Sequence, residues 1–199
     1  MNRQVNLTPA TPERHARRLT LPIATERLLV REFVAQDADA LCSLICDRRV
    51  TRYVFYVPSA RCDAESYVRG VLGYQRQRPR TTWELALTAR MDGDLLGSCN
   101  LTLMSAGEAD LGYMLKRAAW GHGLGTEAAL ALIDAAFEQL RMARVISTVD
   151  VRNAASIRVL EKAGLRWEAT YRKLRKIRGE WRDCHLFTLS REAWSAGIR

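Results

Sequence analysis

The chain has 199 residues, of which 48% are hydrophobic and 27% charged, which is the balance of a soluble globular domain. It has no apolar run long enough to span a bilayer and no signal-peptide core, so we expect a cytoplasmic protein without membrane attachment. The net charge of +9 suits an anionic ligand, a nucleic acid or an acidic partner, and does not choose among them.

The five cysteines are an odd number without a CxxC pair, which indicates neither a disulfide framework nor a zinc site. Cys42 and Cys46 lie four apart on a predicted helix, but no histidine is near them in the sequence. We therefore expect them to be small buried hydrophobic side chains and predict no metal site.

Residues 1–22 are predicted to form a poorly ordered or loosely attached extension, and residues 23–199 a single domain. Residues 26–33 alternate between polar and apolar types as a first strand does. A helix is then expected from Asp37, and a second from Asp63, an N-cap candidate, to about residue 76.

Three strands are predicted in the middle of the chain. Residues 83–88 alternate in polarity, and the Asp92-Gly93 turn joins them to a partner strand over residues 95–103. A further strand covers residues 110–115.

Between that strand and a helix expected to begin near Thr126, the chain reads Trp120-Gly-His-Gly-Leu-Gly-Thr126. The first N–H groups of a helix lack partners and carry partial positive charge, and glycines allow an anion to approach the backbone closely. This stretch therefore predicts a cradle for a phosphate or pyrophosphate.

A strand over residues 144–149 follows the helix, and strand–helix–strand implies parallel pairing with a right-handed crossover. Asn153 caps a shorter helix that ends at Ala163-Gly164, and two strands close the chain around residues 166–172 and 184–190. The pattern predicts an α/β or α+β domain with a mixed, mainly antiparallel sheet and helices on its faces.

Three interpretations of the glycines compete. They can form only a tight turn, or a dinucleotide site in which Asp150, at the end of the next strand, would hold a ribose. The spacing is G-x-G-x-G and not G-x-G-x-x-G, and too little chain remains for another parallel unit. A nucleoside-triphosphate loop fails because no Gly-Lys-Ser/Thr follows. The third interpretation is a coenzyme A site.

The stretch resembles the pyrophosphate loop, Arg/Gln-x-x-Gly-x-Gly/Ala, of the GNAT superfamily of N-acetyltransferases, and within it the RimJ/RimL-like, ribosomal-protein N-acetyltransferase branch. Four further pieces are similar to that branch, in the right order from about residue 23 to residue 194. They are Thr25-Glu-Arg-Leu-Leu-Val-Arg31, Leu111-Gly-Tyr-Met-Leu115, Asn153-Ala-Ala-Ser-Ile-Arg-Val-Leu-Glu-Lys-Ala-Gly164, and Gly179-Glu-Trp-Arg-Asp183 with Arg191-Glu-Ala-Trp194. The resemblance implies the GNAT acyl-CoA N-acyltransferase fold, in which the sheet splays after the fourth strand.

The resemblance also implies direct transfer of an acetyl group from acetyl-CoA to a primary amine in a ternary complex, with a protein N-terminal amine as the leading acceptor. An N–H group of Met114 or Leu115 would point at the thioester carbonyl. Arg158 and Lys162 would meet the ribose phosphate or the adenine edge, although a solvated helix face explains them as well. The pyrophosphate would be bound along Trp120, Gly121, His122, Gly123, Leu124, Gly125 and Thr126, with Trp120 standing where the superfamily has Arg or Gln.

Asn153 and Ser156 match the Asn-x-x-Ser of the RimL-like helix. There the serine is the acid or hydrogen-bond donor for the departing thiolate, and the asparagine contacts the pantetheine arm. Some relatives carry a basic carboxylate in the strand that follows, but residues 171–178 have no acid. Glu84 and Asp110 are the candidate bases, directly or through water.

The acceptor stays open between a protein N-terminus and a small amine such as an aminoglycoside, a polyamine or an amino acid. A non-catalytic acyl-CoA-binding module is a further alternative. The basic tract of residues 166–182 could meet an acidic peptide or RNA, but it matches no nucleic-acid module, and we favour a solvated strand face. A monomer or a homodimer is expected.

Overall fold

The computed structural model describes residues 18–54, 61–104 and 107–197. The predicted extension therefore lies mostly outside the described residues. The described end of this extension, residues 18–22, contacts the domain. Leu19 and Leu21 are partly buried against the main core, and the N–H of Thr20 donates to Oε1 of Gln139 at 2.7 Å.

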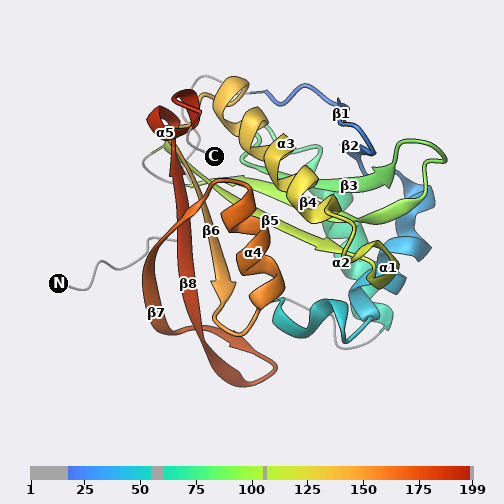
Figure 1. Ribbon diagram of the computed structural model, residues 1–199. Helices are drawn as coiled ribbons and strands as arrows, with labels where there is room; N and C mark the ends of the chain where they lie inside the picture. The colour runs from blue at the N-terminus through green and yellow to red at the C-terminus, as the bar shows by residue number, and fades with distance from the viewer. Residues whose placement is uncertain (1–17, 55–60, 105–106, 198–199) are drawn as a thin grey trace.

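A single sheet runs through the described part of the chain (Figure 1). Its eight strands have the order β1-β2-β3-β4-β5-β6-β8-β7, and β5 pairs in parallel with β6 while the other neighbours are antiparallel. This confirms the expected mixed, mainly antiparallel sheet. The strands are β1 Ile23–Ala24, β2 Leu28–Glu32, β3 Thr82–Ala89, β4 Leu95–Leu103, β5 Glu108–Leu115, β6 Arg144–Asp150, β7 Arg166–Ile177 and β8 Glu180–Ser190.

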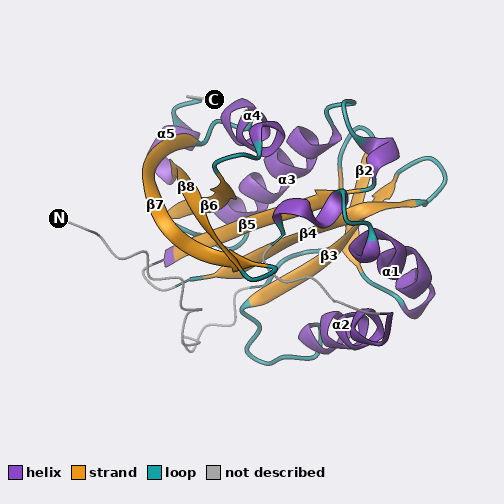
Figure 2. Ribbon diagram, turned by 90° about the horizontal axis from the view of Figure 1, so that it is seen from below, coloured by secondary structure: helices purple, strands orange, loops and turns teal. Residues whose placement is uncertain are grey.

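Two pairs of helices cover the two faces of the sheet. Figure 2 shows α3 and α4 on one face and α1 and α2 on the other. The helices are α1 Ala38–Cys46, α2 Arg61–Tyr74, α3 Leu124–Glu138, α4 Ala154–Lys162 and α5 Arg191–Ser195, with short 3-10 segments η1 Ala35–Asp37, η2 Val50–Tyr53 and η4 Arg117–Ala119. The N-cap prediction for Asp63 is wrong, because α2 begins two residues earlier.

The turns between these elements follow local chemistry. In the β3–β4 hairpin the N–H of Ala89 donates to the carbonyl oxygen of Asp94 at 2.8 Å, and Gly93 has a φ of 81°, which suits a residue without Cβ. Asn153 Oδ1 accepts from the N–H of Ser156 at 3.2 Å, as predicted for the N-cap of α4.

Alternation along the strands builds two cores. On β3, Trp83, Leu85 and Leu87 pack with the buried face of α3, whereas Ala86 packs with α1 and α2. The same alternation places Glu84 on the α1–α2 face. The Glu84 side chain therefore lies between the sheet and the layer formed by α1 and α2.

The cysteines do not share one environment. Cys99 and Cys184 are buried and Cys42 is half-buried, but Cys46 is exposed. Our expectation of burial is wrong for Cys46 because it ends α1 and faces away from the core. Among the described residues, no helix is both long and apolar enough to cross a membrane.

Candidate active site

The two parallel strands β5 and β6 separate soon after they meet. They pair from Glu108 and Arg144 to Asp110 and Ile146, and one residue later Ser147 Oγ donates to the carbonyl oxygen of Leu111 at 2.9 Å. β5 continues to Leu115 along β4, so beyond this point its other edge no longer pairs with β6. This is the splay expected after the fourth predicted strand.

The backbone at the end of β5 presents one peptide to the splay. The N–H of Lys116 donates to the carbonyl oxygen of Leu96 on the β4 side at 2.7 Å. Because successive peptides of a strand point to opposite edges, the N–H of Leu115 faces the β6 side and that of Met114 faces β4. The Met114 side chain packs against the α1–α2 core. Of the two predicted donors, Leu115 has the required orientation.

Trp120 fixes the start of the glycine loop. Its Nε1 donates to the carbonyl oxygen of Leu115 at 2.8 Å, while about half of the side chain stays exposed. The indole therefore ties the loop to the end of β5 and leaves no side-chain charge at this position of the motif.

The glycine loop carries a run of backbone donors. Gly121 and Gly123 have φ values of 80° and 79°, and α3 begins at Leu124, two residues earlier than predicted. The N–H of Thr126 donates to the carbonyl oxygen of Gly123 at 3.0 Å and is therefore engaged. The five N–H groups of residues 121–125 have no hydrogen-bond partner among the described residues. Consecutive amides of this kind at a helix start form an anion site.

Gly125 brings the start of α3 close to β5 and α4. A Cβ at this position would lie 3.2 Å from Cε2 of Tyr113 and 3.5 Å from Cγ2 of Val159. A side chain would push the helix away from both elements. The glycine therefore holds the anion site next to the splay.

An ion pair that the sequence did not predict supports the loop. Arg27 Nη1 donates to the carbonyl oxygen of His122 at 2.7 Å, and its Nη2 lies 2.7 Å from Oε2 of Glu127. Burial favours the neutral form of Glu127, but hydrogen bonds from Thr25 and Arg27 outweigh it and lower the pKa of Glu127. Arg27 is about a hundred positions away in sequence from both of its partners, His122 and Glu127. The only sequence feature that could have indicated its role was the Thr25-Glu-Arg27 piece of the family resemblance.

Tyr113 and Ser156 form a hydroxyl pair on the α3–α4 face. Their oxygens lie 3.2 Å apart, and either hydroxyl can donate. Burial raises the pKa of Tyr113, and the bond to Ser156 acts in the opposite direction. Ser156 was predicted, whereas Tyr113 was missed because a single tyrosine within an otherwise apolar strand gives no catalytic signal by itself.

The candidate bases lie on the other face of the sheet. Burial raises the pKa values of Glu84 and Asp110 to about 7 each, and the positive charge of Arg175 acts against this rise at Asp110. Asp110 Oδ1 is buried and has no hydrogen-bond partner among the described residues. Glu84 pairs across the ladder with Asn100. The structure thus brings neither acid to Ser156 directly, and the two faces meet only where the sheet opens.

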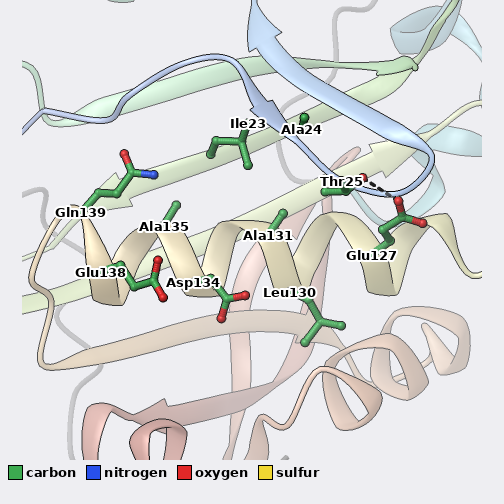
Figure 3. A pocket seen from close by; sticks show the side chains of 10 residues that line it. All are labelled: Ile23, Ala24, Thr25, Glu127, Leu130, Ala131, Asp134, Ala135, Glu138 and Gln139. Atoms are coloured by element: carbon green, nitrogen blue, oxygen red, sulfur yellow. Dashed lines mark hydrogen bonds between the residues drawn. The ribbon is translucent and has the colours of Figure 1, made fainter. Parts of the chain in front are cut away.

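Arg158 and Lys162 are both exposed on α4, one helical turn apart. Their predicted contact with the ribose phosphate or adenine stays a prediction. A separate groove of about 300 Å³ runs between β1 and α3 (Figure 3). It includes Glu127 and Asp134 but none of the loop glycines, so it is not part of this site.

Comparisons with known proteins identify the family of the chain. The family model described as "Acetyltransferase (GNAT) domain" matches residues 27–166. The uncharacterized N-acetyltransferase p20 of Bacillus licheniformis is 28% identical over 176 residues, covering 86% of this chain and 97% of that protein.

Two solved structures share the fold at lower identity. A GNAT-family acetyltransferase from Bacillus anthracis superposes with a TM-score of 0.76 at 24% identity, covering 86% of this chain and 99% of that one. RimL, a ribosomal L7/L12 α-N-protein acetyltransferase solved with coenzyme A, gives a TM-score of 0.74 at 15% identity, covering 85% of this chain and 98% of that one. With the splay, the amide run and the family match together, the chain belongs to the GNAT acetyltransferase family, in its RimJ/RimL-type group, and is an N-acetyltransferase.

Proposed function

We propose that this enzyme transfers the acetyl group of acetyl-CoA to the α-amino group of a protein N-terminus. The observation that carries the donor assignment is the run of five N–H groups at residues 121–125, directly beside the splay, for which the described part of the chain offers no hydrogen-bond partner. RimL, which shares the fold, was solved with coenzyme A, and this supports the same donor here. The pyrophosphate would be held by these amides, and the thioester would lie against the end of β5.

Acetyl-CoA supplies the acetyl group as a thioester. The N–H of Leu115, which faces the β6 side, would donate to the thioester oxygen, on which negative charge grows during attack. In this proposal the Ser156 hydroxyl, which lies 3.2 Å from that of Tyr113, would donate to the departing sulfur. A hydroxyl is a weak acid, and a second hydroxyl behind it can share the charge that develops.

Asp110 is the proposed acceptor of the ammonium proton. Its pKa of about 7 lies close to that of an α-amino group, near 8, and well below that of a lysine-type amine, near 10. Proton transfer to Asp110 is therefore nearly balanced from an α-amine and costs about 3 pKa units from an alkylamine. This difference favours a peptide N-terminus over a polyamine.

The test is a screen with acetyl-CoA as donor. N-terminal peptides, the same peptides with blocked N-termini but a free lysine, an aminoglycoside and a polyamine are compared by coenzyme A release, and products are identified by mass spectrometry. Acetylation of the free N-terminal peptides alone supports the proposal. Turnover confined to the aminoglycoside or polyamine would replace it with a small-molecule function.

A further inference from the structure

Two arginines of the basic tract, residues 166–182, are less exposed than its other basic residues. Arg175 and Arg182 are partly buried, and the Arg182 side chain is only 18% exposed. The other basic residues of the tract are exposed, namely Arg166, Arg172, Lys173, Lys176 and Arg178. The expectation of a solvated strand face therefore holds for these five and not for the two arginines.

An irregularity in β7 places the two arginines opposite each other. The pairing steps from Tyr171 and Cys184 to Arg175 and Arg182, which is four residues along β7 against two along β8. Lys173 lies within this step with a φ of 50°, and its N–H donates to Oδ1 of Asp183 at 2.8 Å. Bulges often turn a side chain toward a functional site.

Both arginines belong to the face that carries the candidate bases. Arg182 alternates with Cys184 and Leu186 along β8, and Leu186 packs against Ile146, which pairs with Asp110. The positive charge of Arg175 is close enough to act on Asp110. At the end of the hairpin, Arg178 Nη2 donates to Oγ1 of Thr51 at 3.0 Å, which ties the hairpin to η2.

The Arg182 guanidinium has unused donor capacity. Its Nη2 lies 2.7 Å from Oε2 of the exposed Glu180, but its buried Nε has no hydrogen-bond partner among the described residues. A guanidinium is shaped to bind a carboxylate or phosphate through two parallel N–H groups. An anion at this position would give the buried Nε of Arg182 a charge-assisted hydrogen-bond acceptor.

We propose that Arg175 and Arg182 bind an anionic group of the acceptor, so that the preferred substrate is an amine that also carries a carboxylate or a phosphate. The acceptor amine would lie at Asp110 and its anion at the arginine pair. This inference rests on the proposed acetyl transfer and adds the chemical class of the acceptor. The anion can belong to an acidic residue near a peptide N-terminus or to a small amino acid.

The experiment compares acceptors that differ only in charge. Peptides with one aspartate at the second, third or fourth position are each paired with the asparagine counterpart, and a free amino acid is paired with its α-amide. We expect kcat/KM to be at least about tenfold higher for the anionic member of one pair, which corresponds to about 1.4 kcal/mol. The pair that shows the preference identifies the source of the anion.

The variants locate the preference. Arg182→Gln, alone and with Arg175→Gln, is expected to bring the ratio within that pair to about 1, through KM more than kcat. Lys176→Gln, next to Arg175 on β7 but with an exposed side chain, is the matched control and should keep the wild-type ratio. Thermal unfolding shows whether each variant is folded. If the double variant does not fold, the ratio measured for Arg182→Gln alone tests the proposal.

Acetylation of anionic and neutral partners at equal rates would overturn the anion site while leaving the proposed function intact. A ratio that survives Arg182→Gln would overturn it as well. If no amine is acetylated, the proposed function fails and this inference fails with it.

Discussion

The hydroxyl oxygens of Tyr113 and Ser156 lie 3.2 Å apart, although 43 positions separate the residues in sequence. One comes from the strand that opens the sheet and the other from the first turn of α4, so the contact exists only where β5 and β6 diverge. Asn153 holds the Ser156 backbone through its cap. Ser156, the predicted acid, therefore has a hydrogen-bonding partner in the Tyr113 hydroxyl, with which it can share its proton.

Ser156→Ala is expected to lower kcat by roughly 10- to 100-fold, with little change in the KM for acetyl-CoA, because the hydroxyl matters most when the thiolate departs. Tyr113→Phe keeps the ring against Gly125 and should lower kcat by a smaller factor. Steady-state measurement of thiol release gives both constants. If the two single changes multiply in the double variant, the hydroxyls act independently and the pair is not a unit.

Gly121→Ala should weaken coenzyme A binding by tenfold or more, since a left-handed φ costs an L-residue about 1–2 kcal/mol and the loop would rearrange. Gly93→Ala is the matched control: φ is 80° at Gly121 and 81° at Gly93, and at either position an added Cβ meets no atom of the described residues within 4 Å. It should reduce the unfolding free energy similarly and leave binding unchanged. Calorimetric titration with coenzyme A measures the affinities; equal losses in the two variants would contradict the proposed cradle.

Asp110 should govern the acidic limb of the pH–rate profile. As a base it acts when deprotonated, so kcat/KM is expected to rise with pH and to level off above about 7. Asp110→Asn should lower activity and remove this limb, whereas Glu84→Gln should keep it. A profile of Asp110→Asn with an unchanged midpoint would assign the limb to another group.

The raised pKa of Asp110 also predicts how the stability of the protein changes with pH. The folded-state pKa of Asp110 lies above its ordinary value of 3.8, so the folded protein binds the extra proton between about pH 4 and pH 7. The stabilising effect is complete below about pH 4 and is lost as the pH rises through 7. Asp110→Asn should therefore unfold at a higher denaturant concentration than wild type at pH 8. At pH 4 the two midpoints should be close, and a constant difference between them would refute the assigned shift.

Arg27→Ala should lower the unfolding free energy by about 1 kcal/mol, because roughly half of this arginine is exposed and its ion pair is screened. Coenzyme A affinity should also fall, since the loop loses the bond to the His122 carbonyl. Thermal melts with and without coenzyme A separate the two effects. Arg90→Ala, which removes a bond to the carbonyl of Thr25 in the preceding turn, is the comparison and should spare the affinity.

Local sequence was sufficient for much of the framework. The Asp92-Gly93 turn, the Asn153 cap and the glycines at 121 and 123 each have a conformation or a bond that only a few residue types supply, so they can be recognised without knowing what lies nearby. Alternating polarity likewise located most strands. The element ends were less accurate, as at α2 and α3, because neighbouring turns extend a helix beyond its best capping residue.

Only the tertiary structure decided which of these residues meet. The Arg27–Glu127 pair, the Tyr113–Ser156 contact and the position of Asp110 on the face that also carries Arg175 join segments far apart in the chain. Sequence period can assign a side chain to a face, but the neighbours on that face depend on strand order, on the separation of β5 from β6 and on the irregularity in β7. These are properties of long-range packing, in which many weak contacts choose one arrangement together, and no single stretch of sequence contains them.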